Sequence, residues 1–208
     1  MRNITTYSKR PEPETPWLSF TDLLSNALIL LSLVLVFSTI ARTINERPPV
    51  IQLPDNEKFR FSSGDYRLSP AFLIALDTEK IPQIRRALTC FGVDTVDIIG
   101  HTDGQPNTGR GNLDSAFLSG KESLTLRKEF RAGSNVDLGL LRAIAVQKAI
   151  ESKIGEDLPN TAYRVYSAGS VINTDGVMEP VTNRDDRERR RIEIRFTRSK
   201  ETTYPKSC

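Results

Sequence analysis

The sequence predicts an α+β protein in which one N-terminal transmembrane helix precedes a β-α-β-α-β-β domain. Three observations predict it: an uncharged apolar run between Leu23 and Ile40, later segments with apolar residues at helical spacing, and short stretches in which apolar and polar residues alternate. The 208 residues leave room for one ordinary domain besides the helix. We therefore divide the chain into an N-terminal tail (1–16), a transmembrane helix (17–41), a short linker (42–54), the domain (55–198) and a C-terminal tail (199–208).

The apolar segment is long enough to cross a membrane. An α-helix rises about 1.5 Å per residue, so about 20 residues cross the hydrocarbon core, and the apolar run extends from Trp17 to Ala41. A cleaved signal peptide would have a shorter apolar region, a basic residue close before it and a small-residue cleavage site. Here Glu12 and Glu14 precede a longer run. We therefore expect an uncleaved anchor, and basic residues at both of its ends leave its orientation open.

The elements of the domain follow from periodicity and turn residues. Alternation and turn-bounded apolar runs predict strands at 58–61, 95–99, 163–167 and 191–197. Helical spacing predicts helices at 70–88, interrupted or restarted at Pro82, and at 136–154. In the last strand Ile192, Ile194 and Phe196 alternate with charged residues, so we expect one buried face. A long polar loop, 104–134, precedes the second helix.

Composition excludes several functions. The net charge is +3, from 29 basic and 26 acidic residues spread through the chain, which gives no argument for nucleic acid. A single His excludes a histidine-rich metal site, and Cys90 and Cys208 fit no zinc pattern. A Cys90–Cys208 disulfide and two free thiols both remain open, and we favour the free thiols. No nucleophile, base and orienting group converge, so we expect neither an enzyme nor a cofactor.

One acidic residue, Asp22, lies inside the apolar run, about one turn from its start. A charged side chain in a membrane helix is costly and usually faces protein or water. Thr21, Ser25 and Asn26 lie beside it on one polar stripe, which suits packing against partner helices. Such an acid can carry protons by alternating between neutral and charged forms. It can equally snorkel to the interface and cap the helix start, and the residues alone leave both interpretations open.

Four motifs occur in order along the domain. Gly100-His101-Thr102-Asp103 follows the strand at 95–99, and Asn135-Val136-Asp137-Leu138-Gly139-Leu140-Leu141-Arg142-Ala143 opens the second helix. Further on come Ser167-Ala168-Gly169 and the run from Arg187 to Ile194. Together they resemble the OmpA/MotB peptidoglycan-binding domain, which has a G-H-T-D turn, an N-x-x-L-S-x-x-R-A helix start, a glycine turn and an N-R-R-V-E strand. The resemblance covers about residues 55–198.

The resemblance implies a binding site for the peptidoglycan stem peptide, whose diaminopimelate carries a carboxylate and an ammonium group. Asp103 matches the residue that binds the ammonium, and Arg142 matches the one that binds the carboxylate, for which a planar guanidinium is suited. Asn135 and Leu138 match positions where the helix start meets the ligand. A plain salt bridge between Asp103 and Arg142 is the alternative. His101 is expected to hold its turn by hydrogen bonds.

The sequence departs from the family at three places. Gly139 replaces the usual Ser and Arg189 the usual Asn, and each change could weaken a local hydrogen bond. The loop at 104–134 is longer than in a typical member and could serve as a lid, a dimer contact or a partner surface. We expect the basic run from Arg187 to Arg191 to be mostly solvated, with one Arg near the ligand.

A membrane helix with Asp22 followed by such a domain resembles the B subunit of an ion-driven stator. The resemblance implies that Asp22 is the proton carrier. It also implies that the helix spans the inner membrane, with the N-terminus in the cytoplasm and the domain in the periplasm. Its partners would be a ring of five A-type membrane proteins, a second copy of the chain and peptidoglycan. The transported ion would be H⁺, with Na⁺ as the alternative. Because its linker is short, the chain resembles ZorB of the Zorya anti-phage system most. The alternatives are a passive peptidoglycan tether and a flagellar MotB-like subunit.

Overall fold

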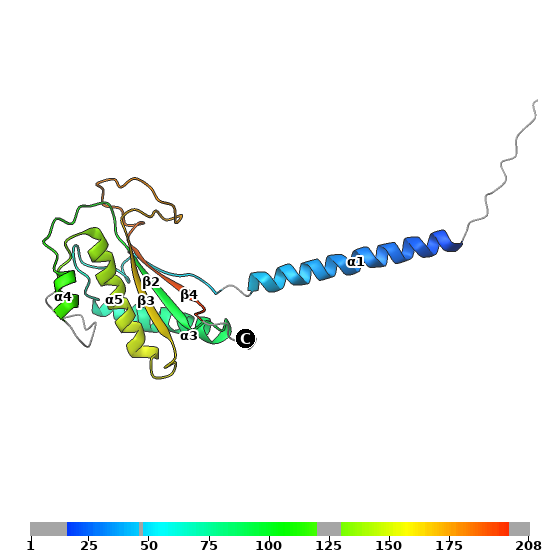
Figure 1. The fold of residues 1–208 in the computed structure, drawn as a ribbon, viewed down its shortest axis with the longest axis horizontal. Helices are drawn as coiled ribbons and strands as arrows, with labels where there is room; N and C mark the ends of the chain where they lie inside the picture. Colours follow the sequence, from blue (N-terminus) through cyan, green and yellow to red (C-terminus); the bar gives the residue numbers. More distant parts are fainter. Residues whose placement is uncertain (1–15, 46–47, 120–129, 200–208) are drawn as a thin grey trace, which may run out of the picture. The chain divides into compact units, whose positions relative to one another are not determined.

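The computed structural model describes residues 16–45, 48–119 and 130–199 and confirms the α+β class. It divides into two compact units, 1–47 and 48–208, which are described separately. The first holds one helix, α1 (Pro16–Asn45). The second holds β1 (Ile51–Pro54), α2 (Pro70–Ala75), a π-helical turn η1 (Leu76–Lys80), α3 (Ile81–Cys90), β2 (Thr95–His101), α4 (Leu113–Ser119), α5 (Asn135–Ile154), β3 (Ala162–Gly169) and β4 (Arg191–Thr197) (Figure 1).

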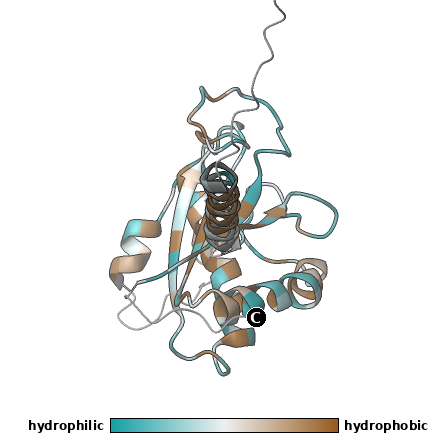
Figure 2. Cartoon of the chain, turned by 90° about the vertical axis from the view of Figure 1, so that its right-hand side faces the viewer, coloured by the Kyte–Doolittle hydropathy of each residue, from teal (hydrophilic) through white to brown (hydrophobic). Residues whose placement is uncertain are grey.

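Helix α1 is apolar over most of its length (Figure 2). The 22 residues from Phe20 to Ala41 have a mean hydropathy of 2.3, and at 1.5 Å per residue they extend about 33 Å, enough to cross a bilayer. Because the helix begins at Pro16, Asp22 lies in its second turn and is not a cap. The hydroxyl of Thr21 donates to the carbonyl of Trp17 at 2.8 Å, a bond of the helix interior. The alternative in which these two residues cap the helix start is therefore wrong.

In the second unit a four-stranded sheet has the order β1-β4-β2-β3. Strands β2 and β3 are parallel, and β4 pairs antiparallel with β2 and with β1. Helix α5 packs on β3 and β2 (Figure 1). One core joins α2, η1, α3 and α5 to the same face of the sheet, where Val96, Ile98, Ile192 and Ile194 are buried. The contact between α5 and β2 places the C-terminal end of β2 beside the start of α5.

The first strand was predicted at the wrong place. Strand β1 is Ile51–Pro54, with Ile51 and Leu53 buried, so the domain begins inside the segment assigned to the linker. The strand ends at Pro54, which is tolerated because β1 is an edge strand. Residues 58–61 form no strand: Asn56 Oδ1 accepts from the backbone N–H of Lys58 and Phe59. Phe59 is buried in the core against Phe72, at 5.3 Å between ring centroids. Its apolar side chain between polar neighbours gave this segment the alternating pattern that is typical of a strand.

The helix predicted at 70–88 is present, with the expected irregularity before Pro82. It continues through α2, η1 and α3, and the π-turn falls just before the proline. Proline lacks an N–H and its ring clashes with the carbonyl four residues earlier, so the helix widens there. Ser69 caps its start by accepting from Phe72 N–H. The prediction of free thiols is wrong for Cys90, which is disulfide-bonded at the end of α3; Cys208 lies outside the described residues.

Two glycines bring α5 into contact with β2. A Cβ added to Gly100 would lie 2.0 Å from the carbonyl oxygen of Gly139. A Cβ added to Gly139 would lie 2.4 Å from Ser167 Oγ and 2.9 Å from the carbonyl oxygen of Gly100. The serine that the family has at position 139 would therefore not fit here without a shift. Glycine at this position is a packing requirement of the close helix–strand contact.

We expect Gly100→Ala to lower the free energy of unfolding by about 3 kcal/mol, because the new methyl group overlaps a backbone carbonyl that cannot rotate away. The matched control is Gly176→Ala, which adds the same methyl group where no atom lies within 4 Å. Gly176 has a φ of 79°, so its cost is backbone strain of about 1 kcal/mol. Urea unfolding of the full chain in detergent measures both, and equal losses would contradict the close contact.

Candidate functional site

All four residues predicted to bind peptidoglycan lie in one place. Asp103, Asn135, Leu138 and Arg142 line one open cleft at the end of β2 and the start of α5. We call it the charged cleft. Its other lining residues are Asp55, Arg60, Phe61, Ser63, Gly64, Gln105, Pro106, Asn107, Asp185, Arg187 and Arg190.

Arg142 is held rigidly in the cleft wall by backbone carbonyls. Its Nε donates to the carbonyl of Asp65 at 2.9 Å and its Nη2 to that of Ser62 at 3.3 Å. The guanidinium lies 4.7 Å from the ring centroid of Phe61, a cation–π contact. Burial lowers the pKa of Arg142 to about 10, and the charge of nearby Arg190 acts in the same direction. The side chain therefore remains a cation at neutral pH, without a carboxylate bonded to it among the described residues.

Asp103 does not pair with Arg142, so the alternative of a plain salt bridge between them is wrong within the described part of the chain. Its carboxylate accepts from Arg190 instead. Arg190 also donates to Asp55 and Asp185. Burial alone would lower the pKa of Arg190, but the hydrogen bonds to these three carboxylates outweigh it and raise the pKa. Arg190 therefore joins acids from three different segments at one wall of the charged cleft.

Asn135 and Leu138 build the helix end of the cleft. The amide of Asn135 donates to the carbonyls of Asp103 and Gln105, at 3.2 and 2.9 Å, so it ties the loop after β2 to α5. Ser134 Oγ caps the helix by accepting from Asp137 N–H at 3.1 Å. Leu138 is 5% exposed. The cap fixes where α5 begins, and this places Arg142 two turns along the same helix beside Asp103.

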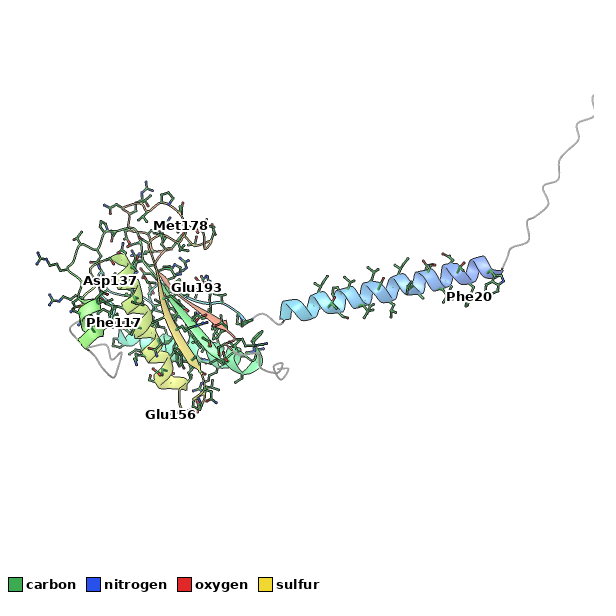
Figure 3. The ribbon with its side chains drawn as sticks, in the orientation of Figure 1. Phe20, Phe117, Asp137, Glu156, Met178 and Glu193 are labelled. Atoms are coloured by element: carbon green, nitrogen blue, oxygen red, sulfur yellow. The ribbon has the colours of Figure 1, made fainter. Side chains whose placement is uncertain are left out.

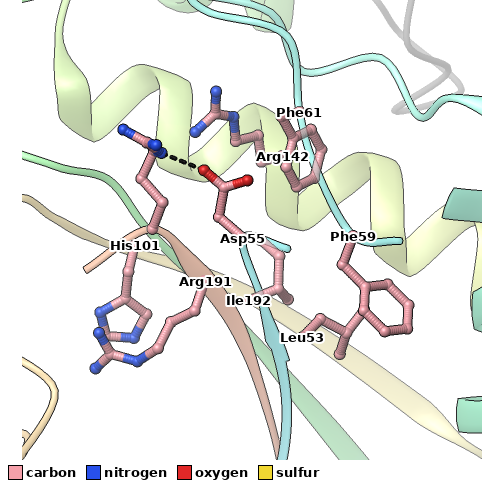
Figure 4. Close-up of a pocket in the computed structure, with 9 residues that line it drawn as sticks. Leu53, Asp55, Phe59, Phe61, His101, Arg142, Arg191 and Ile192 are labelled. Carbon is pink, nitrogen blue, oxygen red and sulfur yellow. Dashed lines mark hydrogen bonds and ion pairs between the residues drawn. The ribbon is translucent and has the colours of Figure 1, made fainter. Parts of the chain in front are cut away.

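A smaller pocket lies against the charged cleft and shares Asp55, Phe61, Arg142 and Arg190 with it (Figure 4). His101 and Arg191 lie side by side at its edge (Figure 4) and occupy paired positions on β2 and β4. His101 is the last residue of β2 and is 3% exposed, so it belongs to the sheet and not to a turn. Its Nε2 lies 3.3 Å from Oε2 of Glu193.

The basic run at 187–191 is solvated only in part: Arg187 and Glu188 are exposed as expected, but Arg190 is half-buried and the other two arginines are buried. Arg189 and Arg191 are 8% and 6% exposed. Arg189 donates to the carbonyl of Ser170 at 3.0 Å and to Glu179, and thereby holds the connection between β3 and β4. Arg191 donates to the carbonyl of Asn173 at 2.8 Å. The arginine that replaces the family's asparagine thus has a structural role in this chain.

Glu193 should make stability depend on pH. It is buried near the middle of β4 (Figure 3); the contact with His101, together with Arg195, outweighs burial and lowers its pKa to about 2. Because the pKa of Glu193 is lower in the folded chain than its unfolded value near 4.5, ionised Glu193 stabilises the fold by roughly 3 kcal/mol at pH values above about 4.5. This stability is lost as pH falls toward 2.

We therefore expect Glu193→Gln to lower the free energy of unfolding at pH 7. The difference from the unsubstituted chain should shrink as pH falls from about 4.5 to about 2, because the native carboxylate is then protonated too. Denaturant unfolding at several pH values measures this. Asp175→Asn, an exposed acid on the β3–β4 connection, is the control. A difference that stays constant down to pH 2 would contradict the assignment.

Sequence reasoning found four residues of the cleft and missed Arg190, Asp55 and Asp185. One arginine of the basic run was expected near the ligand, but no signal identified which. Asp55 was placed at the first position of the domain and given no role. Side chains alternate between the two faces of the sheet from Arg191 onward. Extended back by one residue, this alternation directs Arg190 away from the side that Arg189 and Arg191 occupy, and it was the one sequence signal that could have identified Arg190.

Comparisons with known proteins give structural likenesses only. No protein-family model matches the chain, and no curated protein matches it. The periplasmic domain of Helicobacter pylori MotB is similar at 17% identity, over 74% of this chain and 86% of that one, with a TM-score of 0.45. The cell wall anchor of the T6SS from Pseudomonas aeruginosa is similar at 21% identity, over 71% and 80%, with a TM-score of 0.39. A second MotB periplasmic domain is similar at 19% identity, over 74% and 65%, with a TM-score of 0.43.

Proposed function

We propose that the chain is a membrane-anchored protein that binds the peptidoglycan stem peptide in the charged cleft. The observation that carries the proposal is that Asp103, which follows β2, lines the same cleft as Asn135, Leu138 and Arg142 of α5, although more than 30 residues separate it from them in the sequence. The cleft holds acids and arginines together, so it suits a ligand that carries both an ammonium group and a carboxylate. Diaminopimelate has both groups on one side chain.

In this proposal Arg142 binds the ligand carboxylate, because a buried guanidinium fixed by two carbonyls is preorganised for that geometry. Asp103 binds the ammonium. The carboxylate of Asp103 already accepts from Arg190, so the ammonium shares it with that arginine or displaces it. Displacement is tolerable because Arg190 keeps Asp55 and Asp185 as partners.

Asp103→Asn tests the site with little risk to the fold, since Arg190 retains two carboxylates. We expect the full chain in detergent to sediment with purified peptidoglycan, and Asp103→Asn to weaken this binding about 30-fold, from loss of one charge-assisted contact. Asp175→Asn is the control, as an exposed acid outside the cleft. Equal binding by Asp103→Asn and the unsubstituted chain would refute the proposed site.

We also propose that α1 spans the inner membrane, with the N-terminus in the cytoplasm, and that Asp22 carries protons in a stator-like motor. Asp22, Ser25 and Asn26 are exposed on a helix whose other sides are apolar. In a bilayer such a stripe needs protein or water beside it. A ring of five A-type proteins around two copies of this chain, as in the stators that the sequence resembles, would supply that surround. Peptidoglycan binding would then hold the pair still while ions pass.

Anti-phage defence is the role that we propose for this motor. It is supported by the short connection between the units: α1 ends at Asn45 and β1 begins at Ile51, which leaves no room for the plug helix and long linker of flagellar B subunits. Deleting the gene should raise phage plating efficiency and leave swimming unchanged. Loss of swimming with unchanged plating would favour the flagellar alternative instead.

A further inference from the structure

The first and last residues of the long loop after β2 help to form a second groove. Residues 63–67, 109–110 and 130–132 line this open groove. We call it the arginine groove, because Arg67, Arg110 and Arg131 are among its lining residues. It shares Ser63 and Gly64 with the charged cleft, so the two are neighbours along one wall. The proposed function does not use this groove.

Backbone contacts, hydrogen bonds and aromatic packing hold the two ends of the loop in place. Its two legs run in contact, because a Cβ added to Gly133 would lie 2.5 Å from the backbone nitrogen of Gly111. Asn112 joins them: its N–H donates to the carbonyl of Arg131, and its Oδ1 accepts from Arg131 N–H at 2.7 Å. Phe130 packs with Leu141 of α5, and its ring centroid lies 5.5 Å from that of Phe117 of α4. Arg110 and Arg131 therefore project from a supported surface.

The groove carries uncompensated positive charge. Arg67 is paired with Asp65, which is the acid in the lining. The side chains of Arg110 and Arg131 are exposed, and neither has an ion pair with an acid in the described ranges 48–119 and 130–199. A lining with two free guanidinium groups next to a cleft of mixed charge favours a ligand whose further part is anionic.

We propose that the arginine groove binds a second carboxylate of the stem peptide, the one next to the diaminopimelate. This inference rests on the proposed function. In the stem peptide a D-glutamate precedes diaminopimelate and is linked through its side chain, so its α-carboxylate is free unless the cell amidates it. With the diaminopimelate in the charged cleft and the chain leaving over Ser63 and Gly64, that carboxylate reaches Arg110 and Arg131. The loop thus makes recognition depend on amidation.

The test compares two probes on the full chain in detergent. One is the tripeptide Ala–D-Glu–diaminopimelate, and the other is the same tripeptide with the glutamate α-carboxylate amidated. Isothermal titration gives both affinities. We expect the free acid to bind about fivefold more tightly than the amide, the ratio expected for exposed charge pairs worth up to about 1 kcal/mol. Arg110→Gln combined with Arg131→Gln should reduce the ratio to about one.

Arg86→Gln is the matched control, because Arg86 is an exposed arginine on α3 outside both clefts; it should leave the ratio unchanged. Thermal unfolding of each variant shows that the fold is kept. A ratio near one for the unsubstituted chain would overturn the inference while leaving the proposed function standing. A preference that survives the double substitution would overturn it as well. Failure of both probes to bind would instead refute the proposed function.

Discussion

Asp22→Asn should abolish proton flux while leaving peptidoglycan binding intact. The amide has the size of the acid but cannot titrate, so it cannot release and rebind a proton as the helix surroundings change. The complex, purified from membranes with its partner and reconstituted in liposomes, should show flux with a pH-sensitive dye. We expect the flux through the Asp22→Asn complex to fall to the level of empty liposomes, a loss of at least about 100-fold if the barrier rises by roughly 3 kcal/mol.

Two controls make the Asp22 experiment decisive. Asp22→Glu keeps a titrating group and should retain part of the flux, whereas Ser25→Ala, one turn along the same stripe, should have a smaller effect. Pull-down on peptidoglycan should be equal for all of these chains, because the domain is a separate compact unit. Full flux through the Asp22→Asn complex would leave only the passive tether, with the polar stripe as a helix-packing feature.

Arg142→Lys should weaken stem-peptide binding about 100-fold although the positive charge is kept. Lysine has no planar fork, so it cannot hold the carbonyls of Ser62 and Asp65 and also bind a carboxylate through two N–H groups. It also loses the stacking on Phe61. The loss of a buried, hydrogen-bonded charge contact costs about 2–5 kcal/mol at an interface. Titration of the full chain with the diaminopimelate tripeptide measures the change.

The control for Arg142→Lys is Arg60→Lys, which changes an exposed arginine in the same cleft whose nearest acid, Asp55, lies 3.5 Å away. It should change affinity by less than about fivefold, since such pairs are worth little. Circular dichroism at 25 °C separates lost binding from lost fold. If both substitutions weakened binding equally, Arg142 would act only as one charge among several.

Much of the site could be predicted because its signals are local. Two of the four motifs identified Asp103, Asn135, Leu138 and Arg142, and the apolar patterning identified strands close to β2 and β4. The ion pairing inside the cleft could not be predicted in this way. Asp103 meets Arg190, with Asp55 and Asp185 as further partners, and which of several acids and arginines pair depends on the paths of three loops.

The sequence by itself determined the apolar helix, its single acid, the order of the strands and of the two main helices of the domain, and four residues of the charged cleft, because period and motif act over a few neighbouring positions. The tertiary structure alone decided that β1 lies at Ile51–Pro54, that position 139 has room only for glycine and that Arg189 and Arg191 are buried. It also decided that the long loop presents Arg110 and Arg131 beside the cleft. Each of these depends on contacts between residues far apart in the chain, whose energies no local pattern records.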